Sequence, residues 1–140
     1  MAFLLKVMPD ALARGTAIVP RMKSAALVAG DIGQTVYVWL GNADGQGSAL
    51  HSVTTLTGIA EILVPQHRDP SKKKHAYRLD LSPTEARVAQ PLGTADLAPY
   101  RFVEGADGIE SIGRIDRDRT DKIIRLSSAE ADLLAERFRQ

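Results

Sequence analysis

Cysteine is absent from this chain of 140 residues. The absence excludes a disulfide framework, thiolate metal ligands, thiol redox chemistry and a cysteine nucleophile. It fits a reducing compartment, and we expect a cytoplasmic protein. Long apolar runs are missing as well, because Lys6 interrupts the opening apolar segment and no stretch approaches the roughly 20 residues of a membrane-spanning helix. We therefore expect the opening to form a strand rather than a secretion signal, and we expect no contact with a membrane.

An excess of charge of either sign is also missing. Lys and Arg number 18 and Asp and Glu number 17, so the formal net charge is +1. This balance neither requires nor excludes a polyanionic partner. The composition, 44% hydrophobic and 25% charged, is typical of a globular protein. At this length about two-thirds of the extended chain's surface can be buried, so residues 1–140 are expected to fold as a single domain.

Recognisable catalytic and metal-binding motifs are missing too. His51, His67 and His75 have no zinc-binding spacing, and no nucleophile elbow occurs. The glycine cluster 41–47 lacks the lysine that completes a P-loop, and the β-branched residues after it indicate a hairpin turn. The acids within 116–121 lack the glycine and glutamate of a calcium loop. We therefore expect no enzyme activity, no cofactor and no metal.

Alternating apolar residues predict a strand over 35–40, with Tyr37 and Trp39 on one face. The segment 41–47 then turns the chain into a hairpin. The partner strand is expected over 53–64 or from slightly earlier, with a bulge at Gly58 and an end at Pro65. Further strands are expected at 3–7, ended by a break at 8–10; at 75–81, with Tyr77, Leu79 and Leu81 on one face; and within 115–126.

Proline and capping residues predict short helices. Pro20 is suited to open a helix that ends at Gly30. Residues 82–85 and 127–130 both have the capping-box pattern, which predicts a helix over 83–89 and another after 127 whose apolar face carries Ala131, Leu134 and Phe138. Strands joined by hairpins favour an antiparallel sheet or a partly closed barrel, hence a β-rich α+β fold.

Cations and one aromatic strand face are the features most suited to nucleic-acid binding. Basic loops contact phosphates, although they can also be merely solvated. Tyr37 and Trp39 can stack a base or belong to the core. Both alternatives stay open at this point. The cations are Arg14, Arg21 and Lys23 near the N-terminus, and Arg68, Lys72, Lys73, Lys74 and Arg78 in and after the loop 66–75.

Four short segments together resemble the EVE domains. Residues 3–10, Phe-Leu-Leu-Lys-Val-Met-Pro-Asp, are similar to the opening of that family. Residues 30–31 match the Gly-Asp that precedes its aromatic strand, and residues 58–62 match the strand after its hairpin. Residues 69–71, Asp-Pro-Ser, resemble the short motif that follows. The four segments occur in the family's order and cover about the first half of the chain.

The resemblance implies a PUA-like fold, which is a small mixed, partly closed β-barrel with short flanking helices. It also implies binding of nucleic acid, with a modified or extruded base held in a pocket. By position it places Trp39 on the pocket strand, Lys6 at the end of the first strand and Arg21 near the helix that lines the cavity. Residues 18–21, Ile-Val-Pro-Arg, stand where EVE domains usually carry a tryptophan and an arginine-asparagine motif, so a divergent branch is expected.

The predicted function is therefore binding of RNA, or of single-stranded or modified DNA, without a covalent step. The alternatives are a small-molecule or nucleotide-binding regulatory domain and a structural or partner protein. Solvent access of Trp39 and a cavity beside it distinguish these hypotheses. The predicted nucleic-acid-binding residues are Lys6, Arg21, Lys23, Tyr37, Trp39, Arg68, Lys72, Lys73 and Lys74.

Overall fold

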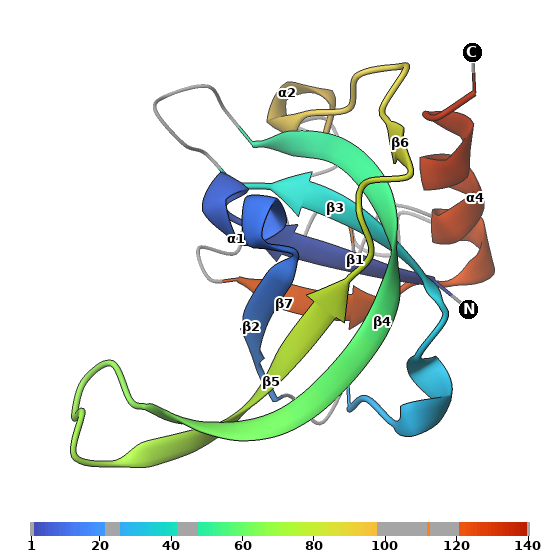
Figure 1. Ribbon diagram of the computed structural model, residues 1–140. Helices are drawn as coiled ribbons and strands as arrows, with labels where there is room; N and C mark the ends of the chain where they lie inside the picture. The colour runs from blue at the N-terminus through green and yellow to red at the C-terminus, as the bar shows by residue number, and fades with distance from the viewer. Residues whose placement is uncertain (1, 22–25, 42–47, 98–111, 113–120, 140) are drawn as a thin grey trace.

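The chain is built around one strongly curved β-sheet (Figure 1). A computed structural model describes residues 2–21, 26–41, 48–97, 112 and 121–139. Their elements, in chain order, are β1 (Ala2–Val7), α1 (Pro9–Arg14), β2 (Thr16–Pro20), the 3₁₀ turn η2 (Ala29–Asp31), β3 (Thr35–Leu40), β4 (Ala49–Pro65), β5 (Lys73–Leu81), β6 (Ala86–Arg87), α2 (Thr94–Leu97), β7 (Lys122–Arg125) and α4 (Ser128–Glu136). None of these helices has the length and apolarity needed to cross a bilayer.

The sheet is mixed and curls into a half-barrel. Its strand order is β2-β5-β4-β3-β1-β7, and β6 pairs with β4 beside this path. β1 and β3 run parallel with Leu4 opposite Tyr37, whereas the other pairs in the order are antiparallel. The outer strands β2 and β7 approach each other, which brings the two edges of the sheet together. The β-rich α+β fold and the partly closed barrel are thus confirmed.

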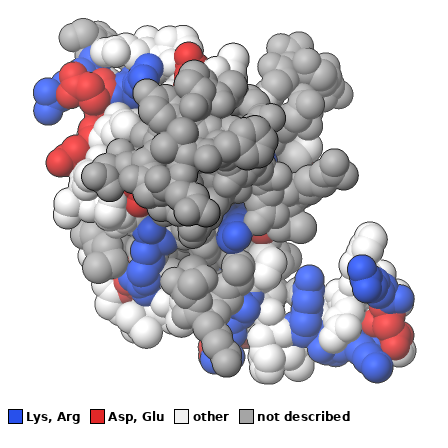
Figure 2. All heavy atoms as spheres, turned by 180° about the vertical axis from the view of Figure 1, so that it is seen from behind, with Lys and Arg blue, Asp and Glu red and all other residues white. Residues whose placement is uncertain are grey.

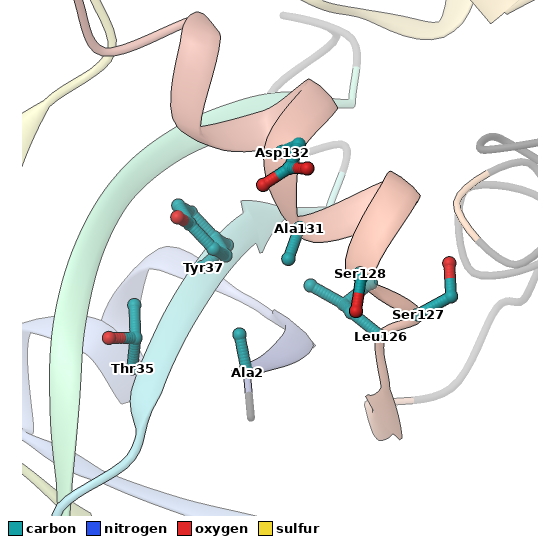
Figure 3. A pocket seen from close by; sticks show the side chains of 8 residues that line it. All are labelled: Ala2, Thr35, Tyr37, Leu126, Ser127, Ser128, Ala131 and Asp132. Carbon is teal, nitrogen blue, oxygen red and sulfur yellow. The ribbon is translucent and has the colours of Figure 1, made fainter.

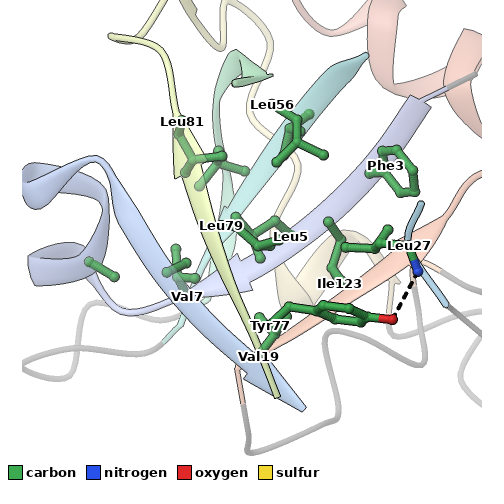
Figure 4. Packing of buried hydrophobic residues seen from close by; sticks show 14 residues of the cluster. Phe3, Leu5, Val7, Val19, Leu27, Leu56, Tyr77, Leu79, Leu81 and Ile123 are labelled. Atoms are coloured by element: carbon green, nitrogen blue, oxygen red, sulfur yellow. Dashed lines mark hydrogen bonds between the residues drawn. The ribbon is translucent and has the colours of Figure 1, made fainter. Parts of the chain in front are cut away.

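The concave face of the sheet encloses the main hydrophobic core (Figure 4). Alternate residues of β1 and β5, such as Leu5 and Leu79, point into it and are fully buried. Tyr77 extends across the core, and its hydroxyl accepts a hydrogen bond from the Leu27 N–H at 3.2 Å. The predicted face of Tyr77, Leu79 and Leu81 is therefore confirmed as core.

The convex face of β1 and β3 is covered by a second hydrophobic cluster. Leu4, Tyr37 and Trp39 pack there together with Leu134 of α4 and with Phe138. Fully burying a side chain such as that of Leu134 contributes about 2 kcal/mol. Since both faces of β1 are covered, its sequence is a continuous apolar run rather than an alternation.

The long strand β4 contains the bulge predicted at Gly58. Its register against β5 shifts between the pair Leu56–Leu81 and the pair Gly58–Asp80. A Cβ atom at Gly58 would lie 2.6 Å from Asp80 Oδ2, so a larger residue at the bulge would require the Asp80 side chain to move. β4 starts at residue 49, which agrees with the slightly earlier start that the prediction allowed, and ends at Pro65 as predicted.

The helix predicted from Pro20 to Gly30 is wrong in the described positions. Pro20 ends β2, in which Ala17 and Val19 alternate inward, and η2 contains Gly30. Every second residue of this segment is buried, and this strand pattern outweighs the preference of proline for the start of a helix. An edge strand tolerates a proline, which has no backbone N–H to donate. The proline that does open a helix is Pro9, at the predicted break. Residues 22–25 lie outside the described part.

The helix predicted over 83–89 is also wrong. The Ser82 hydroxyl accepts the Thr55 N–H at 2.9 Å, and the Glu85 N–H bonds to the Val53 carbonyl. These partners on β4 replace the helix cap, and the chain continues into the short strand β6. The other capping box is confirmed: Ser127 Oγ accepts the Glu130 N–H at 3.1 Å and starts α4.

An ion pair joins the segment before β3 to β7. Asp31 accepts two hydrogen bonds from Arg125, at 2.9 and 2.8 Å, and a third from the Val28 N–H at 2.8 Å. The Arg125 guanidinium also lies 5.0 Å from the centroid of the Phe3 ring. Its hydrogen bonds hold the pKa of the Asp31 carboxyl below the ordinary value of 3.8. The Gly-Asp motif thus acts as a structural tie.

Replacement of Asp31 by asparagine is expected to lower the free energy of unfolding by about 2–3 kcal/mol, because it leaves Arg125 without its carboxylate partner. Urea denaturation measures the change. Asp10→Asn is the control, since the Asp10–Arg14 pair is exposed and its loss should cost less than about 0.5 kcal/mol. Equal losses in the two variants would contradict the structural role of Asp31.

The stabilisation by Asp31 should depend on pH. A carboxyl whose pKa is lowered by folding stabilises the protein above its unfolded pKa, and this stabilisation is lost as the pH falls through the folded pKa. The difference in unfolding free energy between the wild type and Asp31→Asn should therefore be constant from about pH 5 to 7 and shrink below about pH 4. Urea titrations over this range measure it, and a difference that grows on acidification would refute the prediction.

Candidate nucleic-acid interface

The ends of β4 and β5 form an arm that projects from the barrel (Figure 1). We define the β4–β5 arm as residues 63–75. Its tip is a turn in which the Asp69 carboxylate accepts hydrogen bonds from the Ser71 N–H at 3.2 Å and hydroxyl at 2.6 Å. The Lys72 N–H closes the turn on the Asp69 carbonyl at 3.0 Å. The Asp-Pro-Ser motif therefore shapes the tip of the arm.

The arm concentrates positive charge. In Figure 2 its side chains at the lower right form a largely blue group around a smaller red one. All four cations are exposed, and none forms an ion pair with another described residue. They are Arg68, Lys72, Lys73 and Lys74. An exposed ribbon with this charge attracts phosphate groups despite the small net charge of the chain.

An apolar recess of about 210 Å³ lies at the base of the arm. Arg21 directly follows the β2 residues that line it and forms an exposed pair with Glu61, with 3.4 Å between Nη1 and Oε1. Burial raises the pKa of the Asp121 carboxyl at this recess. Lys23 lies outside the described residues. The lining residues are Ile18, Val19, Pro20, Val64, Lys74, Ala76 and Asp121.

Lys6 is inside the protein rather than on its surface. It is 8% exposed and lies between Trp39 of β3 and Lys122 of β7 in the sheet register. The charge of Lys6 lowers the pKa of the Asp121 carboxyl, but burial raises that pKa by more. The contact of Lys6 with a phosphate stays a prediction, and the structure leaves little of this side chain accessible for it.

Trp39, one of the predicted nucleic-acid-binding residues, does not form an open stacking wall. The side chain is 0% exposed and belongs to the convex cluster, and its indole N–H donates a hydrogen bond to the Ser48 hydroxyl. The cause is the parallel pairing of β1 with β3, which brings Trp39 beneath the cover formed by Leu134 and Ile112. The alternative that this indole is core is confirmed.

Tyr37 lines a different, open recess of about 680 Å³ (Figure 3). Its ring packs on Phe138 with 5.6 Å between centroids. Burial raises the pKa of the Tyr37 hydroxyl, and Asp132 adds to this effect. The recess lies beside α4, at the opposite end of the molecule from the arm (Figure 1).

The predicted residues therefore do not form one site. Arg21 directly follows β2 and the four arm cations lie on the β4–β5 arm, whereas Tyr37 lies on β3 beside α4. The sequence reasoning missed Asp132 and the hydroxyls of Thr35 and Ser128 in the second recess; the capping box before α4 was the available signal. Among the residues that the structure describes, no cluster of His, Asp or Glu is arranged to hold a metal ion.

Comparison with known proteins identifies the fold. No family model and no curated protein matches the sequence. The DUF55 domain of human thymocyte nuclear protein 1 matches with a TM-score of 0.54 at 11% identity, over 100% of both chains. Human THYN1 in complex with DNA containing 5-methylcytosine matches with a TM-score of 0.53 at 11% identity, over 99% of this chain and 98% of that one. A Pseudomonas putida protein matches with a TM-score of 0.57 at 13% identity, over 97% and 98%.

These neighbours define the class of the fold. The chain shares the fold of these proteins, a small mixed half-barrel with short helices, in agreement with the fold that the resemblance of the four short segments implied. At 11–13% identity the likeness is one of fold. The chain is thus a divergent representative of this architecture over almost its whole length.

The single tryptophan provides a direct check on the core assignment. Because Trp39 is fully enclosed, its fluorescence should be blue-shifted relative to the urea-unfolded chain. Iodide should quench it far more slowly in the folded protein than in urea, since a charged quencher cannot enter the core. A folded-state quenching rate equal to the unfolded one would overturn the assignment.

Proposed function

We propose that this chain binds nucleic acid through the β4–β5 arm and the neighbouring edge strand β2, by non-covalent contacts alone. The observation that carries the proposal is the likeness of nearly the whole chain to human THYN1, whose structure was solved in complex with DNA containing 5-methylcytosine. DNA with modified cytosine is therefore the first ligand to test. Binding of RNA instead would keep the proposed function and change its substrate.

Electrostatics support the arm as the contact surface. Arg68 and the three lysines Lys72, Lys73 and Lys74 are exposed on a two-stranded ribbon, a shape that can enter a major groove or follow a single strand. Each phosphate that a cation neutralises releases a counterion, so the affinity should fall steeply with salt. Arg21 lies beside the base of the arm, directly after β2, and its charge is partly offset there by Glu61.

The burial of Trp39 changes the expected mode of binding. A base cannot stack on this indole without opening the core. The arm instead supplies phosphate contacts, and the small apolar recess beside Lys74 offers Ile18 and Pro20 as a surface for a base or sugar. Affinity should therefore come mainly from the backbone of the nucleic acid.

Replacing Lys72, Lys73 and Lys74 together by alanine should weaken binding and flatten its salt dependence. If all three contact phosphates, the slope of log K against log salt should fall in magnitude by about 2 or slightly more. Fluorescence anisotropy at several salt concentrations measures both effects. The probes are duplex and single-stranded DNA, each with cytosine or 5-methylcytosine, and an RNA of the same sequence.

A matched triple variant tests whether the position of the charges matters. Arg14→Ala/Arg87→Ala/Arg139→Ala removes three cations from α1, β6 and the end of the chain, outside the arm. It should leave the salt slope close to that of the wild type. Unchanged binding in the lysine variant, or an equal loss in both variants, would reject the arm as the interface.

A further inference from the structure

The second half of β4 has one edge without a partner strand in the described structure. β3 accompanies β4 only as far as Thr55, and the last hydrogen bonds between them join Gly33 and Gln34 to Leu56. At Gly33, whose φ is 95°, the chain turns away from β4. Residues 57–65, which lead into the projecting arm (Figure 1), therefore pair with β5 alone, and no described backbone group bonds to their other side.

The alternation of hydrogen bonds along β4 identifies the groups on this edge. The Gln66 N–H donates to the Lys72 carbonyl at 2.9 Å, so the backbone groups of even-numbered residues in this part of β4 face β5. Pro65 has no N–H, and its odd number places the missing donor on the open edge, where proline is tolerated. Such an edge is a template for a further strand. The N–H and carbonyl groups that it presents are those of Ile59, Glu61 and Leu63.

The side chains along this edge are mostly apolar. Leu63 is 59% exposed, and Ile32, directly before the point where the chain leaves β4, is 45% exposed. Residues 57–65 contain no lysine or arginine, and their one acid, Glu61, pairs with Arg21 at 3.4 Å. Monomeric proteins usually blunt a sheet edge with lysines or with a covering segment. The absence of a cation here indicates an edge that is suited to another apolar strand.

We infer that this edge of β4 binds the same edge of a second copy of the chain, antiparallel and across a two-fold axis. An antiparallel edge is its own complement, because each outward N–H meets a carbonyl of the other copy. With Ile62 on the axis, Leu63 lies opposite Glu61 of the second copy, so the two carboxylates do not face each other. The same register places Ala60 opposite Val64 and forms an apolar seam with Ile62 at its centre.

The positions of the charges favour a second copy over an acidic strand. An acidic partner would need cations along residues 57–65, and these residues have none. The arm cations lie beyond Pro65, so antiparallel pairing places the two cationic tips at opposite ends of the shared sheet rather than against each other. The inference does not rest on the proposed function, because it requires no nucleic acid.

Analytical ultracentrifugation of the full chain without nucleic acid tests the inference. The wild type should show a concentration-dependent equilibrium between monomer and dimer, and a weak one, since two paired strands bury less area than a standard interface. Leu63→Lys places a charge on the edge and should weaken dimerisation by about tenfold or more. Met8→Lys is the control: it adds the same charge at another exposed apolar side chain, before α1, and should dimerise like the wild type.

Amide hydrogen exchange provides a second readout that needs no variant. The N–H groups of Glu61 and Leu63 should exchange rapidly in dilute protein and about tenfold or more slowly once the dimer forms. The N–H groups of Ile62 and Val64, which face β5, should be protected at both concentrations and serve as the internal control. A monomer at every concentration up to about 1 mM overturns the inference. So do equal dimerisation by Leu63→Lys and the wild type, and exchange at Glu61 and Leu63 that is independent of concentration.

Discussion

The parallel pairing of β1 with β3 is the constraint on which the rest of the structure depends. Both strands are covered on both faces, by the concave core on one side and by the convex cluster under α4 on the other. This double burial commits the central aromatic residue, Trp39, to the interior. The polar and charged side chains that a ligand could reach therefore lie at the periphery of the described structure, on the projecting β4–β5 arm and beside α4.

Much of the fold could be predicted from local sequence patterns, because the corresponding structures depend on nearby residues. The alternation in β3, the bulge at Gly58 and the Ser127 cap each depend on neighbours within a few residues or on one paired strand. The errors arose where distant partners decide. Pro20 lies in a strand because β5 pairs with it. Ser82 caps no helix because its hydroxyl accepts a hydrogen bond from the Thr55 N–H. Such partners cannot be read from the segment itself.

The candidate site was harder to predict than the fold, and the short motifs show why. Asp31 and Asp69, which carry two of the four resembling segments, hold the backbone in place: one ties η2 to β7, and the other forms the turn of the arm. Motifs that maintain architecture transfer with the fold. The role of Trp39 did not transfer, because whether an aromatic strand residue faces a cavity or a core depends on what packs over it, here α4 and Ile112.

The charges of this nearly neutral chain are distributed unevenly over the described structure. The arm gathers Arg68 and the lysines 72–74 at one end of the molecule, while Asp132 marks the recess at the other. If the arm binds nucleic acid as proposed, the phosphate backbone would be attracted to the first and repelled by the second. Opposite local charges at the two ends, which the net charge conceals, thus allow one small barrel to offer two chemically distinct surfaces.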